Sequence, residues 1–347
     1  MFYYGIGNIW HYSEVFGNIR QVDIPPKYIL TPKISELLQK IEGSKEVIDS
    51  FPIPLEIEIN IRRRSILKSS LFSARIEGNT LTLSELPRAS SKDQKKAEVL
   101  NILKATNWIY ERPHKDLTVK DISEMHKVSM QGLVEKIDLG QYRTNLEAIF
   151  NSAGIAVYLP PRPSQIQPLL ERLMKFINSS KEPFVPVRAC LAHYTFEKIH
   201  PFLDGNGRVG RLLLLTVLCK GGYSMKGLLA VEEYLDNRRS EYYRSLDSSG
   251  KDVTDYLEFM LEAIAATAED AKNLVLEKQR TEIADLLLPR RAEIFNIIKD
   301  HQMVNFDLIR RRFLAVNERT LRFDLKYLVD RGLVKKLGTT KGVYYTV

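Results

Sequence analysis

The residues best suited to chemistry lie in a twelve-residue stretch, 200–211, with the sequence HPFLDGNGRVGR. His200 has the pKa range of a base that can take a proton from a hydroxyl group. Asp204 offers a carboxylate of the kind that holds Mg²⁺ against phosphate oxygens. Arg208 and Arg211 lie three positions apart on one helix face, where they can bind phosphate oxygens through paired hydrogen bonds. Together these residues indicate a polyphosphate site beside a general base.

The turn inside this stretch suits the same purpose. Gly205 and Gly207 let the backbone come close to a ligand and adopt conformations that other residues avoid. Asn206 is expected to cap the next helix, whose free amides and positive dipole end favour an anion. A lone histidine at a helix end is more often a structural residue, and a lone Gly-Asn-Gly is usually only a turn. Their combination at this spacing favours the functional interpretation.

The elements that must position this stretch are mostly helical. We expect about the first 60 residues to be irregular, because Pro25-Pro26 and Pro52-Ile53-Pro54 interrupt them. Residues 140–163 are short, mixed and rich in glycine and proline, which predicts a β-hairpin or flap between helices. Apolar residues at helical spacing predict helices over 55–76, 91–110, 165–178, 186–199, 206–220, 241–245 and 255–278, with another starting near residue 118.

A different pattern begins at Pro289. Short helices are predicted over 290–300 and 306–313, and a third is capped by Asn317 and ended by Gly332. The alternating segment 333–347 predicts a two-stranded hairpin. Three helices followed by a hairpin resemble a winged helix-turn-helix domain.

This terminal segment carries most of the net charge of +8, because residues 289–347 contain 13 Lys and Arg against 6 Asp and Glu. In its third helix, Leu321, Leu325 and Leu328 share an apolar face. The basic residues Arg319, Arg322 and Lys326 form a stripe on another face. The stripe predicts DNA as a partner, and the alternative is an oligomerisation or protein-binding module with a solvated basic face.

The composition excludes several other classes of protein. The chain has 347 residues, 44% hydrophobic and 27% charged, enough for two or three domains with real cores. Its longest apolar run, 212–219, is far short of the roughly 20 residues that span a bilayer. Cys190 and Cys219 lie within apolar helical patterns, which predicts buried thiols in a reducing compartment. With no signal-peptide pattern at the start, we expect a cytoplasmic protein without a membrane partner.

The motif His-Pro-Phe-x-Asp-Gly-Asn-Gly-Arg-x-x-Arg resembles the signature of Fic-domain proteins, with every defining position filled, and the resemblance extends over roughly 60–270. It implies a mostly α fold, with a Fic-type helical core and a small β-hairpin flap. The corresponding domains are an N-terminal helical region over 1–90, a catalytic core over 91–280 and a winged helix over 286–347. The implied reaction transfers AMP from ATP, with Mg²⁺ as cofactor, to a hydroxyl of a target protein or of the chain itself.

The resemblance also implies individual roles. His200 resembles the general base, Asp204 the Mg²⁺ ligand and Phe202 the buried anchor of the loop. Ile149 resembles the clamp residue of a flap that docks the target segment by strand addition. The residues that it places at ATP are Gly205, Asn206, Gly207, Arg208, Arg211 at the γ-phosphate, and Tyr242 and Tyr243 on the adenosine side.

The segment 73–79, with the sequence SARIEGN, resembles the family's N-terminal inhibitory motif. Glu77 at a helix end could pair with Arg211 and so deny that arginine to the γ-phosphate. Ser73, one turn earlier, would lie on the same face and steady Glu77. Taken alone, Glu77 would be a surface residue in a terminal turn, but the complete motif predicts an autoinhibited adenylyltransferase.

Two other functions remain open at this point. The chain could be a transcriptional regulator that uses its Fic body as a nucleotide sensor. It could also run the reaction in reverse, as a de-AMPylating hydrolase in which Glu77 positions a water. A homodimer is common in the family that the chain resembles and would suit a winged helix.

Overall fold

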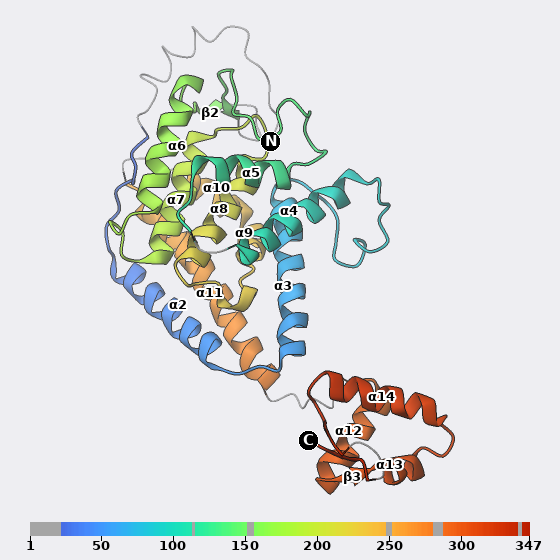
Figure 1. Ribbon diagram of the computed structural model, residues 1–347. Helices are drawn as coiled ribbons and strands as arrows, with labels where there is room; N and C mark the ends of the chain where they lie inside the picture. Colours follow the sequence, from blue (N-terminus) through green and yellow to red (C-terminus); the bar gives the residue numbers. More distant parts are fainter. Residues whose placement is uncertain (1–21, 113–114, 151–155, 248–251, 280–286, 339–341) are drawn as a thin grey trace. The chain divides into compact units, whose positions relative to one another are not determined.

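The computed structural model describes residues 22–112, 115–150, 156–247, 252–279, 287–338 and 342–347 (Figure 1). The chain forms two compact units. The larger unit contains residues 1–51 and 58–274, and the smaller unit contains residues 52–57 and 275–347. Most of the residues predicted as an N-terminal region and as a catalytic core therefore fall in one unit.

Helices dominate the larger unit, as the sequence predicts. In chain order they are α2 (Pro32–Ser50), α3 (Leu55–Ile76), α4 (Gln94–Glu111), α5 (Val119–Ser129), α6 (Pro163–Ile177), α7 (Val185–Ile199), α8 (Asn206–Lys220), the 3₁₀ turn η1 (Met225–Gly227), α9 (Val231–Asn237), α10 (Arg239–Leu246) and α11 (Thr254–Gln279).

Helices α7 and α8 form the centre of the larger unit. They pack against each other, α6 covers α7, and both α4 and α5 pack against α8 (Figure 1). Nearly all side chains of α7 from Pro186 to Phe196 are buried, as expected for a helix that is apolar on every side. The stretch 200–211 connects these two helices and begins the second. The surrounding core therefore holds it in place.

Helix α2 corrects the expectation that about the first 60 residues are irregular. Thr31 caps the helix by accepting a hydrogen bond from the amide of Ile34, and Pro32 occupies its first turn. Pro25-Pro26 and Pro52-Ile53-Pro54, on which the expectation was based, lie outside α2, so they do not interrupt it. Ile34, Ile41 and Ile48 are fully buried. Their helical spacing indicates a helix here, whereas the expectation of irregular structure was based on prolines alone.

The predicted hairpin between helices is confirmed. Strand β1 (Ile149–Phe150) pairs antiparallel with β2 (Ala156–Tyr158). Its tip, with Gly154, lies outside the described residues. Both cysteines are buried free thiols, as predicted. Within the described parts of the chain, no helix has the length and apolar character needed to cross a membrane.

The smaller unit contains the three helices and the terminal hairpin predicted for it. The elements are α12 (Pro289–His301), β3 (Val304–Asn305), α13 (Phe306–Arg312), α14 (Glu318–Asp330), β4 (Lys335–Leu337) and β5 (Tyr344–Thr346). Strand β3 was not predicted, and it pairs with β5 in an antiparallel sheet of order β3-β5-β4. Leu321, Leu325 and Leu328 are buried in the unit's core, as their spacing predicts.

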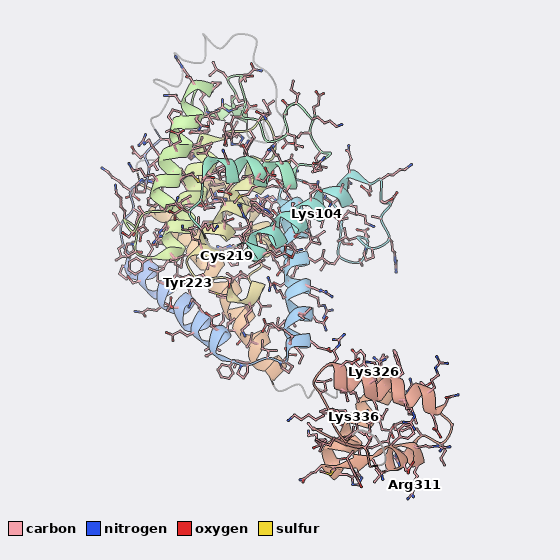
Figure 2. All side chains as sticks on the ribbon, in the orientation of Figure 1. Lys104, Cys219, Tyr223, Arg311, Lys326 and Lys336 are labelled. Carbon is pink, nitrogen blue, oxygen red and sulfur yellow. The ribbon has the colours of Figure 1, made fainter. Side chains whose placement is uncertain are left out.

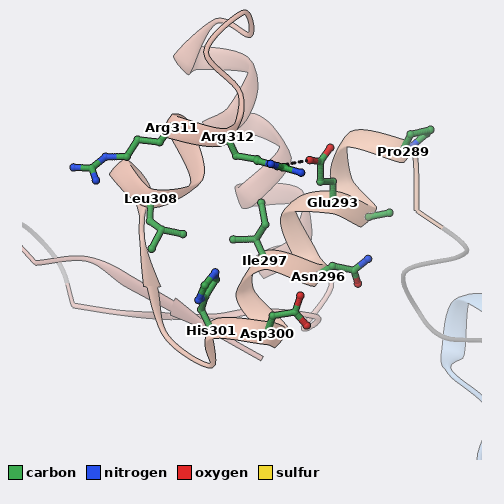
Figure 3. Close-up of a pocket in the computed structure, with 10 residues that line it drawn as sticks. Pro289, Glu293, Asn296, Ile297, Asp300, His301, Leu308, Arg311 and Arg312 are labelled. Atoms are coloured by element: carbon green, nitrogen blue, oxygen red, sulfur yellow. Dashed lines mark hydrogen bonds and ion pairs between the residues drawn. The ribbon is translucent and has the colours of Figure 1, made fainter.

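A groove of about 690 Å³ lies between α12 and α13 of the smaller unit (Figure 3). Its lining includes Leu308 and Ile297 together with the ion pair that joins Arg312 to Glu293 at 3.1 Å. The groove contains none of the residues predicted from the sequence to act on a ligand.

Candidate active site

His200 lies directly after α7, and one nitrogen of its buried ring has no hydrogen-bond partner among the residues that the structure describes. It is the C-cap residue, with φ 49° and ψ 61°, a left-handed conformation that residues other than glycine rarely adopt. The residue is 5% exposed, and Nδ1 lies 3.4 Å from the carbonyl oxygen of Glu197. Nε2 is buried and has no hydrogen-bond partner among the described residues.

Burial, helped by the charge of Arg143, lowers the pKa of His200 to about 4. The imidazole is therefore neutral at pH 7. A proton on Nδ1, directed at the Glu197 carbonyl, leaves the lone pair on Nε2 free. This is the state in which a histidine can accept a proton from a hydroxyl group.

The loop after His200 is closed by Asn206, but not in the way the sequence suggested. Asn206 is the first residue of α8, and Gly205 occupies the N-cap position. The Asn206 side chain accepts a hydrogen bond from the amide of Phe202 at 2.9 Å and donates one to the Phe202 carbonyl at 2.7 Å. The expectation that Asn206 caps α8 is therefore wrong, because its amide group is fully used within the loop. Phe202 is completely buried, which suits the anchor role implied for it.

The two glycines of the loop are needed for different reasons. Gly205 has a φ of 85°, and a Cβ at that position would come within 2.8 Å of the Met130 side chain. Gly207 has no unusual φ, but a Cβ there would collide with Oε1 of Glu77. Gly205 is thus required by backbone conformation, and Gly207 by the close approach of Glu77.

Arg211 and Glu77 form the ion pair that the sequence predicts. Nη2 of Arg211 lies 2.9 Å from Oε1 of Glu77, and the two side chains are 2% and 25% exposed. Burial acts to raise the pKa of Glu77, but the charges of Arg211 and Arg208 outweigh it and lower that pKa. In turn, Glu77 outweighs burial and raises the pKa of Arg211 above its usual range. Both groups are therefore charged at neutral pH.

Ser73 contacts Arg211 and not Glu77, which corrects its predicted role. Nε of Arg211 donates to Oγ of Ser73 at 2.9 Å, and Nη2 donates to the Ser73 carbonyl oxygen at 2.9 Å. The guanidinium spans one turn of α3, so it reaches both Ser73 and Glu77. The end of α3 therefore holds Arg211 at three acceptors.

Arg208 is held by two carboxylates. Nη1 lies 2.6 Å from Oε1 of Glu98 on α4, and Nη2 lies 2.8 Å from Oδ1 of Asp204. Asn79, two residues after Glu77, donates to the other oxygen of Glu98 at 2.8 Å. The sequence does not single out Glu98, because this residue is far from residues 200–211 along the chain and lies in an ordinary helical pattern.

Arg143 is a second residue whose role does not follow from the sequence. The sequence predicts only that it belongs to the flap region, 140–163. Its side chain is fully buried, and Nε donates to the carbonyl oxygen of His200 at 2.8 Å. Its Nη2 donates to Pro161 at 2.6 Å, and its backbone amide donates to Pro201 at 2.9 Å. Arg143 thus fixes the backbone on which His200 is carried.

The other residues predicted to bind ATP, the target or DNA lie in different parts of the fold. Tyr242 is 1% exposed and bonded through its hydroxyl to Nε2 of His193, so it belongs to the core. Tyr243 is partly exposed and donates to the carbonyl of Ile76 at 3.2 Å, at the end of α3. Ile149 lies in β1 opposite Tyr158 and is partly exposed. On α14 in the smaller unit, Arg319, Arg322 and Lys326 are all exposed.

The donor set for a metal is small. Within the described residues, no group of three or more His, Cys, Asp or Glu side chains could hold an ion. The Asp204 carboxylate is 46% exposed, and Oδ1 accepts from the Gly205 amide at 2.6 Å. Mg²⁺ often binds through one or two carboxylates and completes its octahedron with water and substrate phosphates. An accessible carboxylate beside an arginine that can bind phosphate, Arg208, fits that requirement.

Comparison with known proteins agrees with this geometry. Residues 116–218 match the Fic/DOC family. The chain is 31% identical over 221 residues to the protein adenylyltransferase Fic of Drosophila melanogaster, covering 60% of this chain and 42% of that protein. The chain thus spans less than half the length of the curated relatives it matches.

Solved structures show the same fold. A Fic family protein from Desulfovibrio desulfuricans is 25% identical, with a TM-score of 0.66 over 93% of this chain and 98% of that one. Fic-1 from C. elegans, residues 134–508, is 20% identical, with a TM-score of 0.57 over 68% of this chain and 71% of that chain.

Proposed function

Because residues 116–218 match the Fic/DOC family, we propose that the chain transfers AMP from ATP to a hydroxyl group of a target protein, and that Glu77 inhibits this transfer. The observation that carries the proposal is the Glu77–Arg211 ion pair, 2.9 Å long, in the site that also contains the unpartnered Nε2 of His200. The names of the curated relatives support the same activity.

The geometry suits an in-line transfer at the α-phosphate. Nε2 of His200 would accept the proton of the target hydroxyl as its oxygen bonds to the α-phosphorus. The bond from the α-phosphorus to the bridging oxygen would break, and pyrophosphate would leave. Amides in the first turn of α8 and the positive end of its dipole would attract the phosphates. Asp204 would hold Mg²⁺, which neutralises charge on the phosphates when bound.

The inhibition follows from competition for Arg211. Ser73 and Glu77 hold Nε and Nη2 of Arg211, so a γ-phosphate could not bind these two nitrogens as a pair. The charge of Glu77 would also repel the phosphate. ATP could still enter, but its phosphates would lie away from the position needed for attack. Removal of Glu77 should free Arg211 and also clear the space next to Gly207.

The decisive experiment uses ATP labelled separately on the α- and γ-phosphate, with Mg²⁺, on the wild type, Glu77→Gly and His200→Ala. We expect α-label on the protein in Glu77→Gly, little in the wild type and none in the double variant Glu77→Gly/His200→Ala. Glu171→Gly, at an exposed position of α6, controls for the exchange of glutamate for glycine itself. Label from the γ-phosphate would contradict AMP transfer, and equal labelling of wild type and Glu77→Gly would contradict the inhibition.

For the smaller unit we propose DNA binding through α14. In support, Arg319, Arg322 and Lys326 are exposed on one helix of a unit with a large basic excess. Figure 2 shows Lys326 on that helix. Their attraction to phosphates should weaken steeply between about 50 and 200 mM salt. Anisotropy of labelled duplex DNA with the full chain and with Arg319→Ala/Arg322→Ala/Lys326→Ala tests this. Equal binding by both proteins would instead favour a protein-docking module.

A further inference from the structure

A histidine on α5, His126, connects two loops of the candidate active site. It is 1% exposed, and its Nδ1 accepts a hydrogen bond from the amide of Gly140 at 2.8 Å. Its Nε2 lies 3.1 Å from the carbonyl oxygen of Asp204. Because Nδ1 is an acceptor, the proton of the neutral ring is on Nε2 and is donated to Asp204.

The same end of α5 also shapes the loop by packing. The His126 ring stacks on Phe202 with a centroid distance of 3.9 Å and an interplanar angle of 16°. Met130, one turn later, lies where a Cβ on Gly205 would be. Residues 202–205 therefore rest on α5 through one hydrogen bond and two packing contacts.

The orientation of the Asp204 carboxylate depends on few contacts. Its Oδ1 accepts from the Gly205 amide and from Nη2 of Arg208. If Arg208 turns to a nucleotide phosphate, the carboxylate loses one of these two contacts. The hydrogen bond from His126 to the Asp204 carbonyl then becomes a main restraint on the backbone from which the carboxylate extends.

We propose that His126 is a positioning residue, which orients Asp204 for Mg²⁺ by holding its backbone carbonyl. This inference rests on the proposed function, because it assigns Asp204 to the metal. Partners in the outer shell of a metal site commonly change metal affinity by roughly 10- to 100-fold when they are removed. His126 contacts the backbone of Asp204 and not its carboxylate, so its effect on the metal is less direct. We therefore expect a change in Mg²⁺ affinity at the lower end of that range.

Three substitutions separate this role from simple packing. His126→Phe keeps an aromatic ring against Phe202 and removes both hydrogen bonds. His126→Gln places an amide nitrogen near the position of Nε2, so the donor to Asp204 is retained. His126→Asn places an amide oxygen near the position of Nδ1, so only the acceptor for Gly140 is retained.

The measurement is calorimetric titration of Mg²⁺ into the full chain with ATP, in a Glu77→Gly/His200→Ala background that binds but does not react. We expect the Mg²⁺ concentration at half-saturation to rise about tenfold for His126→Phe and His126→Asn, and less than about threefold for His126→Gln. Melting temperatures are measured in parallel. Equal affinities for Phe and the parent, or affinities that follow only the melting temperatures, would overturn the proposal.

The two proposals can fail separately. Absence of α-label in Glu77→Gly would refute AMP transfer, whatever the Mg²⁺ titrations show. Normal α-label transfer by Glu77→Gly, with the same Mg²⁺ dependence in Glu77→Gly/His126→Phe, would refute only the role of His126.

Discussion

Basic side chains are used in opposite ways in the two units of this protein. On α8, the side chains of Arg211 and Arg208 are 2% and 8% exposed, and acids from outside that helix hold them. On α14, those of Arg322 and Lys326 are 60% and 70% exposed. Their acidic partners, Glu318 and Asp330, lie four positions away on the same helix.

This difference determines what each set of charges can do. Removing one partner of a buried pair costs about 3–5 kcal/mol, whereas an exposed pair on one helix contributes about 0.3–0.5 kcal/mol. Arg211 therefore has a small set of well-defined partners, and exchanging one partner for another is a discrete event. The side chains of α14 can exchange weak partners for phosphates individually and at little cost.

The largest effect is expected for Arg211→Ala. In the Glu77→Gly background it removes the donors for the γ-phosphate, so α-label transfer should fall roughly 100-fold or more. In the wild-type background it leaves Glu77 without its partner and should lower the free energy of unfolding by about 3 kcal/mol. Urea denaturation and initial rates of labelling measure the two effects. Retained transfer would mean that Arg211 is not a phosphate ligand.

A second prediction concerns stabilisation by nucleotide. ATP with Mg²⁺ should raise the melting temperature of Glu77→Gly more than that of the wild type, because only the variant offers Arg211 to the phosphates. At 100 times the Kd, ligand binding contributes about 2.7 kcal/mol. Scanning calorimetry with and without ATP measures the difference. Equal shifts would show that Glu77 does not compete with nucleotide.

The third prediction uses Glu197, a carboxyl buried in the larger unit, whose pKa burial raises to about 8. Its pKa in the unfolded chain is near 4.5, so between these values the folded protein holds the extra proton. The stability that Glu197 contributes is therefore present at low pH and is lost as the pH rises towards 8.

Relative to the wild type, Glu197→Gln should gain about 3 kcal/mol of stability between pH 5 and 8, by chemical denaturation. Glu171→Gln, on the exposed face of α6, controls for the substitution itself. A difference that does not vary with pH would contradict the prediction.

The smallest effects are expected on α14. Lys326→Ala should change the free energy of unfolding by less than about 0.5 kcal/mol. It should also reduce the slope of log affinity for DNA against log salt by about 1. Lys104→Ala, an exposed lysine of α4, is the matched control and should leave that slope unchanged (Figure 2). A large loss of stability for Lys326→Ala would remove the contrast between the two units.

Local signals made much of the fold predictable. Asn317 and Gly332 limit α14, and Gly78, with a φ of 101°, follows the end of α3. Such residues act through their own backbone and near neighbours, so their effect can be read without the fold. The error at α2 also comes from local signals, because prolines on both sides of a segment can limit a helix there without excluding it.

Contacts between segments that are far apart in the chain were harder to predict from the sequence. Glu98 and His126 lie in ordinary helical patterns, and nothing in their surroundings separates them from structural residues. Their importance comes from the atoms opposite them, which belong to Arg208 and Asp204. For Glu77 and Arg211, only the resemblance of both motifs to one family linked two residues far apart in the chain.

The sequence by itself determined the chemical groups of the site, because residue types and their spacing along one loop and one helix define them. It also determined most helix limits. Only the tertiary structure decided how far those groups are buried and which partners they bind. Packing buries His200 and leaves its Nε2 without a hydrogen-bond partner in the part of the chain that the structure describes. It also places the side chain of Asn206 in hydrogen bonds with Phe202, and Ser73 in one with Arg211. The physical reason is that burial and pairing depend on neighbours in space, which the spacing of residues along the chain does not specify.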